Sequence, residues 1–326
     1  MKEYDIRPAE IFDQYLKLSA NDAQHCFKGV ERQAVDCPGC GLHTYTKAFK
    51  KLGFDYATCD NCGTLYQTPR PPLESFEAFY HDSESSKYWA ETFFPAVAET
   101  RREKIFIPRV ERLIKFCNEN KFLPETLIDI GAGYGILLEE WKKRYPLKRA
   151  IAIEPSQHLA SICRKKGHEV IENIVEKINQ RDLQADLIVC FEVLEHVFDT
   201  KAFIRAIANL LKPGGHLMFS TLCVDGFDIQ TLWQHSNSIS PHHINFLSRK
   251  GFKELFRHAG LKVVELITPG VLDVDIVKNA DRNDPSLLNK NRFAKQIIGD
   301  KGLAAAFQDF LISEKLSSHL WIFGKK

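Results

Sequence analysis

Three glycines at alternate positions form the first group of residues whose spacing indicates chemistry. Gly131, Gly133 and Gly135 follow a short apolar run that contains Asp129. Glycine at this spacing lets the backbone approach a bound nucleotide closely. The dinucleotide pattern GxGxxG would require its third glycine at Ile136, so this loop departs from that pattern. A carboxylate at Asp129 would repel a pyrophosphate, and it favours a cationic or zwitterionic ligand.

A second acidic residue lies where a nucleoside could use it. Glu154 ends the next apolar run, 19 positions after Gly135. A carboxylate at this place can accept hydrogen bonds from both ribose hydroxyls, and each such bond is worth roughly 1.5–3 kcal/mol. A nucleoside without phosphates that carries an amino acid and a positive sulfur meets both requirements. The two carboxylates and the loop therefore predict S-adenosylmethionine as the ligand.

Two CxxC pairs indicate a metal. Cys37, Cys40, Cys59 and Cys62 have the spacing C-x2-C-x18-C-x2-C, which predicts a tetrahedral structural zinc site. Four thiolates would close the coordination shell and leave no position for a reacting water. Such a metal holds a small fold together, with an apparent binding free energy of about 10 kcal/mol. The alternatives are a redox pair and plain buried cysteines. The resulting ribbon could bind substrate, cover the active site or brace the helices around it.

The turn E-x-x-E-H offers further ligands or acid–base groups. Glu192, Glu195 and His196 have the spacing i, i+3 and i+4, so they share a face if a helix has begun there. Two carboxylates and one imidazole could hold a divalent cation. The alternative is that Glu195 is solvated while His196 packs and hydrogen-bonds locally.

Two adjacent histidines are the candidates for a general base. His242 and His243 follow Pro241 in a long segment, residues 223–248, between a predicted strand and a predicted helix. Imidazole can remove the proton of a hydroxyl acceptor near neutral pH. Since neighbouring side chains in an extended chain point to opposite sides, one of the two is expected to face the pocket. The alternative is that both cap or hydrogen-bond the helix that begins near Ser248.

Strands and helices that alternate from residue 126 onward are expected to position these groups. The alternation predicts an α/β fold with a parallel, doubly wound sheet. The predicted strands are 127–130, 150–154, 169–173, 186–192, 216–222, 261–268 and 317–326. The predicted helices between them are 135–145, 156–167, 200–211 and 249–260.

Four segments carry a resemblance to a known family. IDIGAGYG, AIEPS, DLIVCFEVLEHV and LLKPGGHLMFST occur in this order and resemble successive motifs of class I S-adenosylmethionine-dependent methyltransferases. The resemblance covers about residues 126–265. It implies a seven-stranded, Rossmann-like methyltransferase sheet whose last strand pair is antiparallel. The E-x-x-E-H turn is similar to that of ubiquinone-pathway O-methyltransferases, in which it can bind a divalent cation.

The resemblance also implies which residues contact the cofactor. The glycine loop would hold the methionine end and the acidic residue the ribose, and the polar stretch that begins at Glu172 would contact adenine. The expected cofactor contacts are Asp129, Gly131, Gly133, Tyr134, Gly135, Glu154, Pro155, Asn173, Ile174, Glu192 and His196.

The whole chain divides into four expected regions. They are an N-terminal helical segment at 1–34, a zinc ribbon at 35–70, a helical connector at 71–125 and the class I methyltransferase domain at 126–326. The last region carries a helical insert at about 270–317.

The acceptor is the least determined part of the prediction. The ribbon, the core and the segment SPHHINFLSRKGFKELFRHAGL together resemble methyltransferases of sugar and surface-glycan biosynthesis. Sugar C-methyltransferases carry a large additional C-terminal domain, whereas about 55 residues follow Gly270 here. The expected reaction is therefore methylation of a hydroxyl on a sugar, nucleotide sugar or glycan precursor, with carbon methylation as an alternative.

Two further readings of the function stay open. The first is an RNA base methyltransferase whose phosphate-binding patch comes from a basic run, for which a solvated helix face is the alternative; the run is Arg101, Arg102, Lys104 and Arg109. The second is not an enzyme at all, because the ribbon could be a protein-binding module on a cofactor-binding body.

Composition sets outer limits on these functions. A net charge of +2 with 44% hydrophobic and 26% charged residues is typical of a globular protein and not of a dedicated nucleic-acid binder. No apolar run is long enough to span a bilayer, and the first 18 residues lack the apolar core of a secretory signal. Nine cysteines, four of them in CxxC pairs, suit a reducing cytoplasm. Oligomeric state is left open.

Overall fold

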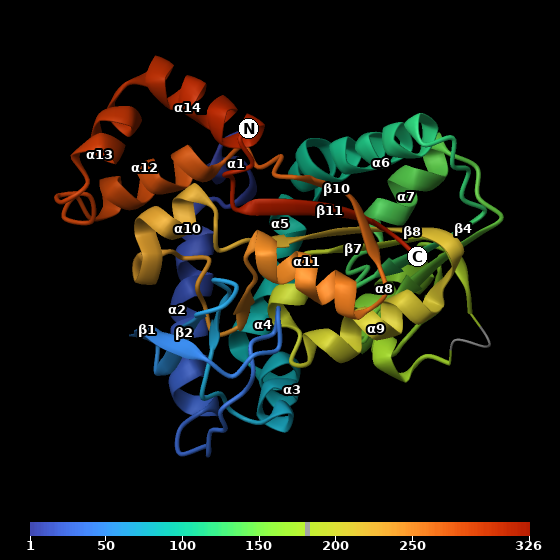
Figure 1. Ribbon diagram of the computed structural model, residues 1–326, viewed down its shortest axis with the longest axis horizontal. Coiled ribbons are helices and arrows are strands. Elements are labelled where there is room, and N and C mark those ends of the chain that lie inside the picture. Colours follow the sequence, from blue (N-terminus) through green and yellow to red (C-terminus); the bar gives the residue numbers. More distant parts are fainter. Residues whose placement is uncertain (180–182) are drawn as a thin grey trace.

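The computed structural model describes residues 1–179 and 183–326, and its centre is a mixed β-sheet with helices on both faces (Figure 1). The strands of this sheet lie in the order β10-β11-β8-β7-β4-β5-β6. Their bounds are β4 Thr126–Ile130, β5 Arg149–Ile153, β6 Glu169–Ile171, β7 Ala185–Phe191, β8 Leu211–Leu222, β10 Lys262–Ile267 and β11 His319–Lys325.

The strand order and directions confirm the predicted fold class. β4 pairs parallel with β5 and with β7, whereas β11 pairs antiparallel with both β8 and β10. The sequence order reverses at β4, because β5 lies on one side of it and β7 on the other. In open α/β sheets this switch point is where ligands bind, beyond the carboxyl ends of the strands. The glycine loop begins there, directly after Ile130.

The helices cover the two faces of the sheet and bury its strands, which explains why the strands read as almost continuous apolar runs. One core includes Leu113 of α6, Trp141 of α7 and Cys163 of α8. The other includes Phe203 of α9 and Phe252 of α11. These helices are α6 Ile107–Glu119, α7 Ile136–Arg144, α8 Gln157–Lys165, α9 Thr200–Leu210 and α11 Arg249–His258.

A second, smaller sheet contains the cysteine pairs and has the strand order β1-β2-β3-β9. β1 is Tyr45–Lys51, β2 is Phe54–Cys59 and β3 is Leu65–Gln67. The fourth strand, β9 (Asn245–Phe246), comes from the segment that carries the two adjacent histidines. The predicted ribbon region therefore shares its sheet with a part of the chain 180 residues away, and the four-part division of the chain stays a prediction.

The remaining helices lie before the central domain and in two segments within it. Before it lie α1 Glu3–Ile6, α2 Ala9–Cys26, α3 Leu73–Asp82, α4 Glu84–Tyr88 and α5 Phe94–Arg101, with π-helical turns at Trp89–Phe93 and Arg102–Phe106. The segment 223–248 contains α10, Phe227–Leu232, and segment 270–317 contains α12 Asp273–Asn283, α13 Arg292–Gly299 and α14 Lys301–Ser313. Figure 1 shows α12–α14 as a group apart from the central sheet, beside the N-terminus. In the described ranges no helix is long and apolar enough to cross a membrane.

The E-x-x-E-H segment differs from the expectation that its three residues share a helical face. Only Leu194–His196 form a short 3-10 turn, and α9 begins later, at Thr200. Glu192 lies before this turn with a φ of 55°, in the left-handed region that non-glycine residues rarely adopt. The spacing i, i+3 and i+4 therefore does not bring these side chains together by helical geometry.

Candidate active site

The glycine loop has the backbone shape that its sequence predicts. Gly131, Gly133 and Gly135 have φ values of 71°, 55° and 70°. A Cβ on Gly131 would lie 2.5 Å from Cγ2 of Val193, and one on Gly135 would lie 2.8 Å from Cδ2 of His168. Both the backbone conformation and the close neighbours therefore require glycine here. The loop leads from β4 into α7 and leaves an open backbone surface at the switch point.

Glu154 is fixed at the carboxyl end of β5 by two backbone amides. Its Oε2 accepts a hydrogen bond from the Gly133 N–H at 2.9 Å, and its Oε1 accepts one from the Ser156 N–H at 2.9 Å. Burial raises the pKa of this carboxyl, and the two N–H donors oppose that rise. The carboxylate is thus tied to the glycine loop and has lone pairs left for a ligand. Its expected contact with ribose stays a prediction.

Asp129 is buried at the end of β4, just before the glycine loop, and its carboxyl is close enough to Glu154 to be affected by that charge. Burial and the charge of Glu154 together raise the pKa of Asp129 to about 8, against the opposing charge of Arg109. Two carboxyls that share one buried region are stabilised by a positive charge between them. This arrangement suits the cationic or zwitterionic ligand that the sequence predicts.

The other expected cofactor residues have diverse surroundings. The ring of Tyr134 stacks on Phe94 with centroids 4.3 Å apart, and its hydroxyl donates to the Ala90 carbonyl, so Tyr134 joins α5 to the loop. Pro155 is exposed after Glu154. Ile174 is 36% exposed, which leaves an apolar surface for a base to stack on.

Glu172 and Asn173 are engaged within the chain. Glu172 accepts from Arg164 Nη1 at 2.6 Å, and Asn173 Oδ1 accepts from the Ile174 N–H at 2.9 Å. Any contact that these two residues make with adenine stays a prediction.

Glu192 is held by three side chains from distant parts of the chain. Its Oε1 accepts from Ser220 Oγ at 2.5 Å, from His319 Nε2 at 2.7 Å and from Arg109 Nη2 at 3.3 Å. Burial alone would raise the pKa of Glu192, but His319, Arg109 and Ser220 together bring it below its ordinary value. Glu192 is therefore an anchored carboxylate at the end of β7.

The rings of His242 and His243 have different neighbours, although Pro241 and His242 form a turn and not the extended chain on which the expected alternation rests. The Nδ1 of His242 lies 3.3 Å from the hydroxyl of Tyr15 and 3.4 Å from that of Ser19, and its ring packs on Phe79. In the described residues its Nε2 is buried without a hydrogen-bond partner. Neither histidine caps α11, since the side chain of Ser248 accepts from Gly251 there. Tyr15 and Ser19 are four residues apart and therefore share one face of α2. The sequence shows this spacing, but it does not show that the face contacts His242.

His243 is fixed in one tautomer. Its Nδ1 lies 2.6 Å from the carbonyl oxygen of Ser238, and because a carbonyl only accepts, this nitrogen carries the proton. The Nε2 of His243 therefore has a free lone pair. His196 is fixed in the same way, with Nδ1 donating to the His242 carbonyl at 2.9 Å. Burial lowers the pKa of His243 to about 3 and that of His196 to about 4, so both rings are neutral.

The group that the structure brings together is Glu195, His196 and His243. One ligand atom from each lies within 4.8 Å of the others. Glu192 is not a member, because its carboxylate is taken by Arg109, Ser220 and His319. Neutral imidazoles whose other nitrogen donates to a carbonyl, beside one carboxylate, are a donor set that divalent metals accept. His196 belongs to this group, and its expected contact with the cofactor stays a prediction.

The cysteines form one buried cluster. The sulfur atoms of Cys37 and Cys62 lie 3.5 Å apart, as do those of Cys40 and Cys59. In a tetrahedron with Zn–S bonds of about 2.3 Å, neighbouring sulfurs are about 3.8 Å apart. The arrangement fits a closed four-thiolate zinc site, and it leaves no position for a substrate.

The cysteine module also holds the histidine segment in place. The Gln67 N–H donates to the Ile244 carbonyl at 3.0 Å, and the Tyr56 hydroxyl lies 3.4 Å from the His243 carbonyl, to which it donates. At the next turn, the Ser248 hydroxyl donates to the Cys62 carbonyl. The backbone on both sides of the two histidines is thereby bonded to the module.

The basic residues proposed as an RNA-binding patch mostly form ion pairs and ring contacts within the chain. Arg102 pairs with Glu139 and Glu140 at 2.8 and 2.5 Å, and Lys104 pairs with Asp5 at 2.6 Å. Arg109 is buried and bound to Glu192, and Arg101 lies over the rings of Trp89 and Phe94. These contacts replace the exposed phosphate-binding patch that the run suggested.

Comparisons with known proteins agree with this fold. A sequence profile described as Methyltransferase domain matches residues 97–266. The ubiquinone biosynthesis O-methyltransferase of Serratia proteamaculans (strain 568) is 37% identical over 103 residues, which are 30% of this chain and 43% of that protein. The enzyme of that name from Xanthomonas oryzae pv. oryzae (strain PXO99A) is 38% identical over 103 residues, which are 29% of this chain and 42% of its own. This chain therefore spans less than half the length of the curated relatives it matches.

A solved structure extends the similarity over more of the chain. The plantazolicin methyltransferase BpumL, in complex with a monoazolic desmethylPZN analog and SAH, superposes with a TM-score of 0.52 at 14% identity. The superposition covers 77% of this chain and 93% of that one. At this identity the likeness shows the fold alone.

Proposed function

Because the chain belongs to the methyltransferase domain family, we propose that it transfers a methyl group from S-adenosylmethionine to a hydroxyl oxygen of a small-molecule acceptor. The observation that carries the proposal is the pair of carboxyl groups, Asp129 and Glu154, beside the glycine loop at the switch point. The glycine loop, Asp129 and Glu154 offer backbone and carboxylates to a phosphate-free, positively charged nucleoside. The anchored Glu192 stands at the end of the neighbouring strand β7.

The reaction is an in-line displacement at carbon. The acceptor oxygen forms a bond to the methyl carbon while the bond from carbon to sulfur breaks, and the sulfur keeps the electron pair and becomes neutral. Alignment of the two reactants is the main contribution that the protein can make. The proton of the hydroxyl must go to a base, and the free lone pair on Nε2 of His243 is the acceptor we propose. His242 is the second candidate, because its Nε2 is buried without a partner among the described residues.

The same surroundings could activate the hydroxyl in a second way. Glu195, His196 and His243 would hold a divalent cation, which supplies Lewis acidity toward an acceptor oxygen when bound. If His243 acts as a base, no metal is needed at this group, whereas the second mechanism requires one divalent cation per chain there. Elemental analysis of the purified protein therefore separates the two mechanisms.

For the acceptor, we propose only that the atom that receives the methyl group is an oxygen. Relatives named as O-methyltransferases favour oxygen over carbon. Their names refer to ubiquinone biosynthesis, so they give no support to the expected sugar, nucleotide-sugar or glycan acceptor. The basic run gives none to an RNA base, because its side chains are bonded within the chain.

We also propose that the cysteine cluster holds one structural zinc ion. The sulfur spacing supports this proposal, and the bonds from the module to residues 243–248 give the metal a purpose. Zinc would set the position of the histidines without touching the substrate.

Two measurements test the proposed function. Calorimetry with S-adenosylmethionine is expected to show one site per chain, and Glu154→Ala is expected to weaken it, because the residue anchors the loop and would face the ribose. Transfer of a tritiated methyl group is then screened over phenols, nucleotide sugars, glycans and RNA, with a hydroxyl compound as the expected acceptor. Absence of cofactor binding, or transfer to RNA alone, would contradict the proposal.

A further inference from the structure

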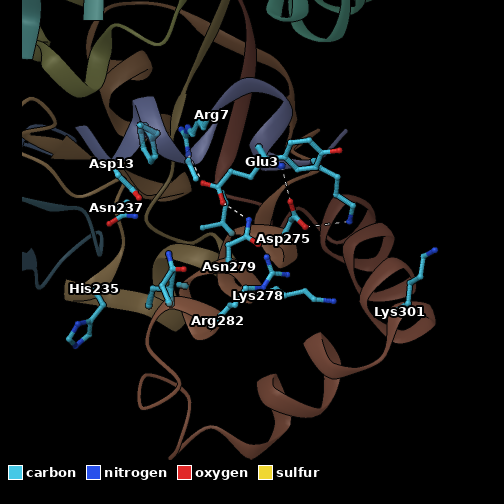
Figure 2. Close-up of a pocket in the computed structure, with 18 residues that line it drawn as sticks. Glu3, Arg7, Asp13, His235, Asn237, Asp275, Lys278, Asn279, Arg282 and Lys301 are labelled. Carbon is cyan, nitrogen blue, oxygen red and sulfur yellow. Dashed lines mark hydrogen bonds and ion pairs between the residues drawn. The ribbon is translucent and has the colours of Figure 1, made fainter. Parts of the chain in front are cut away.

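A pocket of about 570 Å³ lies between the N-terminal segment and α12, and neither the glycine loop nor Glu154 lines it. Figure 2 shows Glu3 and Arg7 of the N-terminal segment across from Lys278, Asn279 and Arg282 of α12. Figure 2 also labels five other residues that line the pocket: Asp13, His235, Asn237, Asp275 and Lys301. Pockets of roughly 300–1,000 Å³ are of the size that binds small molecules.

The pocket has a surplus of positive charge. Its lining contains five cationic side chains against three carboxylates: Lys2, Arg7, Lys278, Arg282 and Lys301 against Glu3, Asp13 and Asp275. Two of the carboxylates are already paired, Glu3 with Arg7 at 3.4 Å and Asp275 with Lys2 at 3.3 Å. In the part of the chain that the structure describes, no ion pair is formed by Lys278, Arg282 or Lys301. Three cations thus remain against Asp13, a surplus of two charges.

A series of side-chain contacts joins the lining of the pocket to His242. The guanidinium of Arg7 lies over the ring of Phe12, 5.3 Å from its centroid, and both residues line the pocket. Phe12 stacks with Tyr15 at a centroid distance of 6.1 Å, and the hydroxyl of Tyr15 lies 3.3 Å from Nδ1 of His242. Two aromatic rings in contact, Phe12 and Tyr15, therefore connect the pocket lining with His242.

We propose that this pocket binds a phosphate or diphosphate group carried by the methyl acceptor. The inference rests on the proposed function, because it assigns a substrate class to the same active site. A surplus of two charges matches a dianion better than a single carboxylate. Arginine recognises phosphate oxygens through paired N–H groups and lysine acts as a point charge, so Arg282 and Lys278 provide both kinds of contact. For the hydroxyl-bearing part of the acceptor to reach the histidines, the rings of Phe12 and Tyr15 would have to turn aside.

Binding of two phosphate probes tests this assignment directly. Calorimetry with inorganic pyrophosphate and with uridine diphosphate is expected to show one site for each probe on the wild-type chain. The double variant Lys278→Ala/Arg282→Ala is expected to lower both affinities at least tenfold. The matched control is Lys253→Ala/Lys165→Ala, which removes two exposed cations of α11 and α8 and is expected to leave both affinities unchanged.

The outcomes separate this inference from the proposed function. If neither probe binds, or if both bind equally well to the Lys278→Ala/Arg282→Ala variant, the pocket is not a phosphate site, whether or not S-adenosylmethionine binds. Failure of S-adenosylmethionine to bind the wild-type chain would instead contradict the methyltransferase proposal. With a phosphorylated acceptor from the screen, the double variant should raise KM and leave kcat unchanged. A fall in kcat alone would overturn the assignment.

Discussion

Leu65 of β3 pairs with Phe246 of β9, three residues after His243, so the cysteine module and the histidine segment belong to one sheet. The partner strand is only two residues long, and further bonds from Tyr56, Gln67 and Ser248 reinforce it. A short strand of this kind depends on the sheet that it joins. The position of the histidines should therefore depend on the metal.

Loss of the zinc ligands should consequently reduce turnover more than cofactor binding. The double variant Cys37→Ser/Cys59→Ser is expected to lose the proposed zinc ion, which elemental analysis of both proteins would measure. We also expect its kcat to fall at least tenfold, because the histidine segment loses its support. Affinity for S-adenosylmethionine should change little, since the glycine loop lies on the other sheet. The control is Cys26→Ser, an exposed cysteine outside the cluster. Full turnover in a zinc-free chain would show that the module has no such role.

Substitution of His243 tests its part in proton removal. We expect His243→Ala to lower kcat by about 10²–10⁴, the usual contribution of a general base, with an unchanged dissociation constant for S-adenosylmethionine. His242→Ala is measured separately, and His258→Ala on α11 serves as the control. If both His242→Ala and His243→Ala retain full turnover, neither histidine is the base.

Cofactor affinity should depend on pH through Asp129. The pKa of this carboxyl is about 8 without ligand, mainly through burial, and a cationic ligand prefers the ionised form. Binding below pH 8 therefore has to release a proton, so affinity should rise between pH 6 and pH 8, by at most about tenfold per unit. Calorimetry in two buffers of different ionisation enthalpy measures the proton release. Asp129→Asn should remove this slope, and a slope that persists in this variant would exclude Asp129 as its source.

Asp228 should make the protein less stable as pH rises. This carboxyl of α10 is fully buried, and burial and the neighbouring Asp273 raise its pKa to about 8. Its folded pKa lies above the ordinary value of 3.8, so the folded state binds the extra proton and stability falls between about pH 4 and pH 8. Asp228→Asn should therefore raise the free energy of unfolding at pH 8 by roughly 1–3 kcal/mol. Denaturant unfolding at pH 5 and pH 8 measures the change, with Asp309→Asn on exposed α14 as the control; an equal effect at both pH values would contradict the assignment.

The sheet and the glycine loop could be predicted because their signals are local. The apolar run that became β4, the alternation of strands and helices and the glycines at alternate positions are short-range patterns that burial on both faces imposes. Even the antiparallel last strand followed from the family resemblance, and β11 confirms it.

The contacts around Glu192 and the histidines could not be predicted, because they join distant parts of the chain. Arg109 appeared in the sequence as one member of a basic run, and His319 as a residue of the last predicted strand, yet both bind Glu192. Tyr15 on α2 reaches His242 across 227 positions. The expected helical face of the E-x-x-E-H turn was wrong because Glu192 adopts a left-handed backbone, which no residue spacing reveals.

The place of β11 bears on how the protein is made. This strand, residues 319–325, inserts between β8 and β10 and brings His319 to Glu192. Since β8 and β10 both precede β11 in the sequence, they are synthesised before the strand that pairs with both of them. A growing chain can thus form its glycine loop early, whereas the carboxylate of Glu192 gains its histidine partner only after β10 has been made.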